Sequence, residues 1–228
     1  MCIRDSNYPM PTGTFPVWGA IGGRTQAVFV GSDSRIYAVG SEDLLLHNAN
    51  TNGTAWGVTN LSLPADTTVF DINKWEGSAG TGNNNGNATG ERDGFLAFST
   101  IAGDLYVTGR GASYVQFQAS NADWTKIDLP VGIRMVDFAV GHQTLLVLGN
   151  DGNLYASGSA TYFGNGTSAD LNILTILARQ PPISTSGITQ IEAGYRSYLV
   201  LDGDGTIHVL GENSEGSLGV GHTDDLTQ

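Results

Sequence analysis

Few residues in this chain combine a reactive type with a useful spacing. The segment Asp202-Gly203-Asp204-Gly205 alternates carboxylates with glycines, as loops that bind calcium do. It lacks the closing bidentate glutamate and the flanking helices of an EF-hand, and it lies between two short apolar runs. We therefore interpret it as a tight turn, for which Asp and Gly are the expected residues.

The motifs give no support to hydrolytic, nucleotide or metal chemistry. The chain has no Gly-x-Ser-x-Gly elbow for a serine nucleophile, no Gly-rich phosphate loop, and no set of cysteines and histidines at zinc spacing. His142 and His208 could transfer protons, but both belong to repeated positions that tyrosine fills elsewhere in the chain. We predict no catalytic residue, no metal site and no cofactor, and hence a protein that is not an enzyme.

Paired carboxylates that cleave glycosidic bonds are a separate case, because that chemistry depends on a distance in space rather than on sequence spacing. Nothing in the sequence singles out particular acidic residues for this role. We interpret the candidates as solvated acidic surface: Asp43, Asp137, Glu192 and Asp224.

The elements that would position any site come from an internal repeat. Its four copies are anchored on glycines that each close a short apolar run, at Gly40, Gly109, Gly158 and Gly211. Three positions before the anchors stand Tyr37, Tyr106, Tyr155 and His208. Seventeen positions before the anchors, three copies carry glycine, at Gly23, Gly141 and Gly194. We interpret all of these as structural repeat positions, in a repeat near the ~50 residues of long propeller blades.

Each copy predicts a β-hairpin. The paired apolar runs are rich in Val, Leu, Ile, Phe and Tyr and are about five residues long, which favours strands over helices. Between the runs lie segments such as Gly149-Asn150-Asp151-Gly152, whose residue types suit tight turns. The predicted fold class is therefore all-β.

The third and fourth copies resemble the regulator of chromosome condensation repeats. The resemblance rests on Gly141-His142 with Asp151-Gly152, on Gly194-Tyr195 with Asp204-Gly205, and on the tail from Gly211 to Gly221. It implies a β-propeller with antiparallel four-stranded blades, in which the histidine after the glycine bonds within its blade. The family forms seven-bladed rings, whereas 228 residues suffice for about four blades, so we expect an incomplete propeller. Missing blades or a partner chain would then cover the open sheet edges.

Composition divides the chain into three segments. Residues 1–15 are expected to be a disordered leader of artefactual origin, because Met1-Cys2-Ile3-Arg4-Asp5-Ser6 resembles a translated adapter from environmental sequence assemblies. Residues 16–228 are expected to form the partial β-propeller. Within it, Gly77–Gly90 is rich in Gly and Asn and predicts a flexible loop inserted in a blade.

The charge of the chain restricts its partners. A formal net charge of −12, with only two lysines, argues against binding to nucleic acid or to an anionic membrane. No apolar run is long enough to insert in a membrane, and Cys2, the single cysteine, excludes an internal disulfide. Low lysine content and richness in Asn, Gly and Thr favour an extracellular or virion surface over the cytoplasm or nucleus.

These observations favour a non-enzymatic module that binds another protein, or serves a structural role, with the ligand recognised by blade loops. Trp56 and Trp124 each precede a Leu-Pro pair, which indicates either core packing between blades or a binding hot spot. The alternative is implied by the resemblance alone: a regulator of a small GTPase that acts by guanine-nucleotide exchange.

Overall fold

The computed structural model describes residues 12–22, 26–40, 57–77, 94–109, 111–115, 123–159, 171–177 and 186–226. Trp56, Gly23 and Asp43 lie outside these residues, as do residues 1–11 and the part of the predicted inserted loop that follows Gly77. The described residues form antiparallel sheets with one short helix, α1 (Ala112–Val115), and one 3-10 turn, η1 (Val69–Asp71). The all-β prediction is confirmed.

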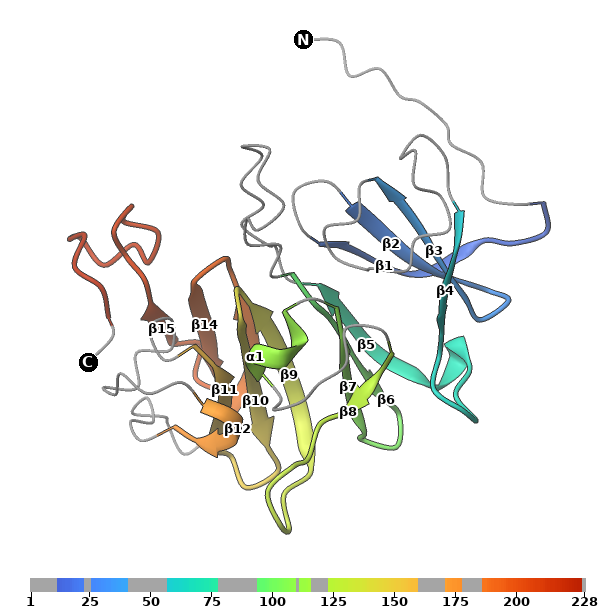
Figure 1. The fold of residues 1–228 in the computed structure, drawn as a ribbon. Coiled ribbons are helices and arrows are strands. Elements are labelled where there is room, and N and C mark those ends of the chain that lie inside the picture. Colours follow the sequence, from blue (N-terminus) through green and yellow to red (C-terminus); the bar gives the residue numbers. More distant parts are fainter. Residues whose placement is uncertain are drawn as a thin grey trace, which may run out of the picture.

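Four sheets follow one another along the chain (Figure 1). The first and second sheets consist of β1 (Pro16–Gly22), β2 (Gln26–Gly31), β3 (Arg35–Gly40), β4 (Gly57–Ser62), β5 (Ile72–Gly77), β6 (Leu96–Thr100), β7 (Leu105–Thr108) and β8 (Thr125–Lys126). The third and fourth consist of β9 (Met135–Gly141), β10 (Thr144–Gly149), β11 (Leu154–Gly158), β12 (Leu171–Ile176), β13 (Ile188–Ala193), β14 (Ser197–Asp202) and β15 (Ile207–Gly211). In the fourth sheet, an isolated antiparallel bridge between Gly211 and Leu226 stands beside β15, where the other sheets have a fourth strand.

The predicted hairpins are the second and third strands of each sheet, and all four share one register. The cross-strand partners are Phe29 and Tyr37, Phe98 and Tyr106, Val147 and Tyr155, and Val200 and His208. Each hairpin turn also donates a backbone N–H to the residue or turn before the first strand of its sheet. These bonds join Ser32 to Phe15, Ile101 to Asp71, Asn150 to Arg134 and Gly203 to Gly187, at 2.7–2.9 Å. In every repeat, the same backbone hydrogen bond therefore connects the hairpin turn to the start of its own sheet.

The core lies between neighbouring sheets in three clusters. One joins the first and second sheets around Val30, Ile36 and Phe98, and another joins the second and third around Leu105 and Val147. A third cluster joins the third and fourth sheets. The first strands of successive sheets contact one another, β1 with β5, β5 with β9 and β9 with β13, so they form the inner side of the stack. Face-to-face packing of successive sheets around their first strands is the arrangement of propeller blades.

The antiparallel order gives the stack two unlike faces. The four tight turns of the hairpins lie on one side, which we call the tight-turn face. Connections between the first and second strands, and between the third and fourth strands, lie on the opposite side, which we call the long-connection face. The loop between β13 and β14 and the segment that follows β15 belong to the latter. Loops on a rigid scaffold are the usual place for binding residues.

Candidate functional site

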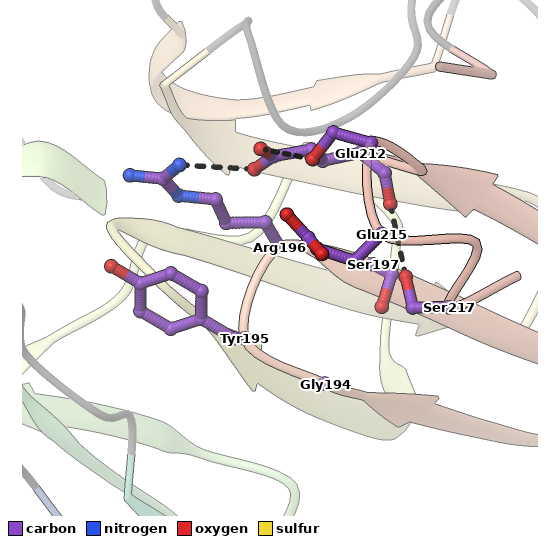
Figure 2. Close-up of a pocket in the computed structure, with 8 residues that line it drawn as sticks. Gly194, Tyr195, Arg196, Ser197, Glu212, Glu215 and Ser217 are labelled. Atoms are coloured by element: carbon purple, nitrogen blue, oxygen red, sulfur yellow. Dashed lines mark hydrogen bonds and ion pairs between the residues drawn. The ribbon is translucent and has the colours of Figure 1, made fainter. Parts of the chain in front are cut away.

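A pocket of about 470 Å³ opens on the long-connection face of the fourth sheet (Figure 2). One side is formed by the loop between β13 and β14, and the other by the segment that follows β15. The lining residues are Gly194, Tyr195, Arg196, Ser197, Glu212, Ser214, Glu215 and Ser217. The first segment leads into β14 and the second follows β15. Because these two strands pair with each other, the sheet fixes the distance between the two sides of the pocket.

An ion pair ties the two sides of the pocket together. Arg196 Nη1 lies 3.0 Å from Glu212 Oε2, and each side chain is 29% exposed. The backbone repeats the connection, since the Glu212 N–H donates to the Arg196 carbonyl at 2.8 Å. The Ser214 hydroxyl donates to the other carboxylate oxygen of Glu212 at 3.1 Å. A charge-assisted bond supported by further hydrogen bonds holds its side chains in one geometry.

Tyr195 is an exposed aromatic residue held from two sides. Its ring stacks on His142 of the third sheet, with centroids 4.8 Å apart and an interplanar angle of 28°. The backbone N–H of His142 donates to the Tyr195 carbonyl at 2.7 Å. On the other side, the guanidinium carbon of Arg196 lies 4.9 Å from the centroid of the Tyr195 ring. Tyr195 nevertheless remains 41% exposed. Its surface is therefore presented in a fixed orientation, with little conformational entropy left to lose on binding.

Asn213 organises the segment that forms the second side of the pocket. It is fully buried, and its side-chain amide donates to the carbonyls of His222 and Asp224 at 2.7 and 3.2 Å. Its side-chain oxygen accepts the Leu218 N–H at 2.9 Å. Its own N–H donates to Asp225 Oδ1 at 2.6 Å. An asparagine offers both donors and an acceptor, which explains how one side chain can fix a segment without regular secondary structure.

The repeated tyrosines lock the hairpin turns. The Tyr37 hydroxyl donates to Asp33 Oδ2 at 2.8 Å, and the Tyr155 hydroxyl donates to Asp151 Oδ2 at 2.7 Å. Burial and the bond to Asp33 raise the pKa of Tyr37, and the bond to Asp151 raises the pKa of Tyr155. The other two positions differ: Tyr106 stacks on Phe98, and His208 Nε2 lies 3.5 Å from Asp202 Oδ2. All four side chains lie in the sheets, away from the pocket lining.

Three anchor glycines have a left-handed backbone, Gly109, Gly158 and Gly211. Their φ angles are 108°, 115° and 111°, respectively. A Cβ at Gly158 would collide with the backbone of Gln143 and Thr144, and one at Gly211 would collide with the backbone of Arg196 and Ser197. Only glycine combines this φ with so close an approach. Gly141 ends β9, Gly194 directly follows β13, and Gly40 ends β3.

Trp124 lies in an aromatic cluster of the second sheet. Its ring centroid is 4.7 Å from that of Phe98 and 5.5 Å from that of Trp75, both in edge-to-face geometry. Trp75 also stacks on Phe98, at 5.6 Å. The Trp124 ring is partly buried against the core cluster of the first and second sheets and does not line the pocket.

A second polar cluster lies on the inner strands. Lys74 Nζ of β5 is 2.7 Å from Asp137 Oδ1 of β9 and 2.9 Å from Glu76 Oε1, and it donates to the Phe138 carbonyl at 2.6 Å. Burial alone would lower the pKa of Lys74, but Asp137 and Glu76 outweigh it and raise this pKa. Burial also raises the pKa of Glu76 despite its neighbour Lys74.

The interpretation of Asp137 as solvated surface is wrong. Its side chain is 19% exposed and is engaged by Lys74 and by the N–H of Ile191, which donates to Oδ2 at 3.2 Å. Glu192 and Asp224, by contrast, are exposed. Separation in sequence concealed the cluster, because Lys74 and Asp137 lie in different repeats.

The pocket residues Arg196 and Glu212 were not singled out as a site by the sequence. One signal was present: Arg196 follows the Gly194-Tyr195 pair, and Glu212 follows the anchor Gly211, at equivalent ends of adjacent strands. Because β14 and β15 are antiparallel, residues before the first and after the second meet at one edge. Among the residues that the structure describes, no cluster of three or more metal-binding side chains occurs. None of the described helices has the length and apolar character needed to cross a bilayer.

No protein-family model matches the chain. Its structure is similar to Prp20p of Saccharomyces cerevisiae, with a TM-score of 0.66 and 16% identity over 96% of this chain and 50% of that one. It is also similar to human WBSCR16, with a TM-score of 0.58 and 16% identity over 84% of this chain and 46% of that one. The chain thus spans about half the length of the solved structures that it matches. At this identity the comparison establishes the fold, which is a β-propeller like that of yeast RCC1 (Prp20).

Proposed function

We propose that the chain is a non-enzymatic module that binds another protein through its long-connection face, with the pocket around Tyr195 as the anchor point. The observation that carries this proposal is the fixed, 41% exposed ring of Tyr195 between His142 and Arg196. Tyrosine and arginine are enriched among the residues that dominate binding energy at protein interfaces. A ring that is already immobilised loses little entropy when a partner covers it.

The charge of the chain supports a partner segment that is basic. The chain carries a net charge of −12, and Glu215, Asp224 and Asp225 are at or near the pocket. The Asp224 side chain is 92% exposed. Complementary charge raises association rates and favours partners of the opposite sign, and its effect weakens with salt. The low lysine content further supports a location on an extracellular or virion surface, which stays a proposal.

The test compares two aromatic residues on opposite faces. Peptides are selected from a random displayed library against the whole chain, and the affinities of the selected peptides are measured for Tyr195→Ala and Phe70→Ala. Phe70 is 71% exposed on the tight-turn face and serves as the matched control. We expect a loss of about 30-fold or more for Tyr195→Ala, the effect of a hot-spot residue, and no loss for Phe70→Ala. Equal affinities of the two variants would contradict the assignment of the site.

The alternative is a regulator of a small GTPase. The similar protein Prp20p binds Gsp1p and histones. Analogy of fold is the support for this alternative. An exchange assay distinguishes the two: release of fluorescent GDP from a small GTPase is followed with substoichiometric chain. Accelerated release would favour the alternative and overturn a purely binding role.

A further inference from the structure

The outward face of the fourth sheet repeats a face that is buried in the other three. In the third sheet, the residues twelve, ten, four and two positions before the anchor glycine are at most 3% exposed: Leu146, Leu148, Leu154 and Ala156. The same positions are equally buried in the first sheet, at Val28, Val30, Ile36 and Ala38, and in the second, at Ala97, Ser99, Leu105 and Val107. In the fourth sheet these positions hold Leu199, Leu201, Ile207 and Val209. There, Leu199 is 45% and Ile207 61% exposed.

The polar side chains on the first strand of the fourth sheet also occupy positions that form hydrogen bonds between sheets elsewhere in the chain. We call the contact between two successive sheets a junction. At the junctions of the second with the third sheet and of the third with the fourth, a side-chain oxygen on the first strand of one sheet accepts a hydrogen bond from a backbone N–H on the first strand of the next. Glu76 Oε2 accepts from Val140 at 2.9 Å, and Asp137 Oδ2 accepts from Ile191 at 3.2 Å. By strand register, Glu192 corresponds to Glu76 and Gln190 to Asp137. Both are exposed and bond to each other at 2.8 Å, so acceptors for a further strand are already in position.

The first sheet carries the complementary face. In the later sheets, the residue eleven positions before the anchor packs on the preceding sheet and is fully buried, at Phe98, Val147 and Val200. The equivalent Phe29 of the first sheet is only half-buried, and Val58 on the same face is 36% exposed, while Tyr37, which pairs with both, is buried. The first and fourth sheets lie at the two ends of the row of sheets (Figure 1), so these two faces do not meet among the residues that the structure describes.

We propose that the outward face of the fourth sheet binds the first sheet of a second copy of this chain. The occupant follows from continuity with the three junctions inside the chain, because the first sheet presents the residue columns that those junctions use. Such head-to-tail contacts form closed rings when the rotation permits closure. Two copies supply eight sheets, which lies within the range of known propellers. The dimer then has two identical junctions, each between the fourth sheet of one copy and the first sheet of the other.

The first experiment measures mass in solution for the whole chain. Light scattering coupled to gel filtration is expected to give twice the 23.9 kDa of one chain. Leu199→Glu and Ile207→Glu are expected to give the monomer, because each places a charge in the apolar junction. Ile101→Glu, at a position 73% exposed on the tight-turn face, is the control and is expected to stay dimeric. A monomeric wild-type chain, or a dimer unaffected by both substitutions, would overturn the proposal.

A second experiment tests the orientation. At the junction of the third and fourth sheets, the Tyr198 hydroxyl bonds to Thr144 Oγ1. By repeat position, the equivalent residues of a junction between copies are Ser197 and Ala27. In a Cys2→Ser background, chains carrying Ser197→Cys are mixed with chains carrying Ala27→Cys and treated with a short bis-maleimide. Cross-linking of the mixture but of neither chain alone supports the head-to-tail contact. Cross-linking of Ser197→Cys with itself would show a symmetric contact and overturn it.

Discussion

The two lysines of the chain give a controlled test of the packing between sheets. Lys74 and Lys126 each form an ion pair with an N–O distance of 2.7 Å, with Asp137 and Asp104 respectively. The Lys74 pair joins the second and third sheets, with side chains 26% and 19% exposed. The Lys126 pair lies within the second sheet, with side chains 54% and 39% exposed. The two ion pairs therefore have the same charged groups and the same N–O distance, but the Lys74 pair is more buried than the Lys126 pair.

Replacing each lysine by methionine keeps most of the apolar stem and removes the charge. Removing one partner of a fully buried pair costs about 3–5 kcal/mol, since the other charge is left unpaired. The remaining exposure of Lys74 and the N–H donors that still reach Asp137 reduce this, so we expect Lys74→Met to cost about 2 kcal/mol. We expect Lys126→Met to cost below about 1 kcal/mol, as for exposed pairs. For a chain of this length, the melting temperature would fall by about 4–8 °C and by a few degrees at most, respectively.

Urea unfolding monitored by tryptophan fluorescence measures both variants, since Trp75 lies next to Lys74 in the sequence. A double-mutant cycle with Asp137→Asn isolates the pair and is expected to give a coupling of about 1 kcal/mol or more. Equal unfolding midpoints for the two methionine variants would refute the reasoning, because they would show that the inner cluster contributes no more than a solvated surface pair.

Two further predictions concern the repeat itself. Gly158→Ala combines a left-handed φ with a backbone collision and is expected to cost about 3 kcal/mol, whereas Gly152→Ala, with φ 79° and open space around its Cβ, is expected to cost about 1 kcal/mol; equal urea midpoints would contradict this difference. The pKa values of Tyr37, Tyr155 and Tyr198 are raised, so their neutral forms stabilise the folded chain fully below pH 10, and this contribution is lost as the pH rises through the folded pKa values. Ultraviolet titration should therefore show tyrosines that ionise later than free tyrosine, and Tyr155→Phe should remove one of them; a single transition at the ordinary pKa would contradict the hydrogen bonds assigned to these hydroxyls.

The hairpins could be predicted from sequence because their information is local. The Asp-Gly turns, the five-residue apolar runs and the anchor glycines all lie within about twenty residues of one another, and each has a direct physical reason. Gly158 illustrates this, since its φ of 115° and its contact with Gln143 belong to the same hairpin edge. The prediction of sheets that pack in succession followed from repetition of this unit.

The pocket and the inner cluster could not be predicted in the same way. Lys74 meets Asp137 only because two sheets stack, and Tyr195 stacks on His142 for the same reason. The repeat position of His142 and Tyr195 was recognised, but the resemblance implied only a bond of the histidine within its own blade and not a contact with Tyr195 of the next sheet. Contacts between repeats depend on the rotation from one sheet to the next, which no local pattern encodes.

The bond from each hairpin turn to the start of its own sheet has a consequence for engineering. These hydrogen bonds each join two parts of the same repeat, and their donors are Ser32, Ile101, Asn150 and Gly203. No neighbouring repeat is needed to hold the turn in place. Chimeras that exchange whole units should therefore retain their turn geometry, whichever neighbour they receive. Grafted recognition sequences are best placed at the opposite ends of the strands, where they leave these hydrogen bonds intact.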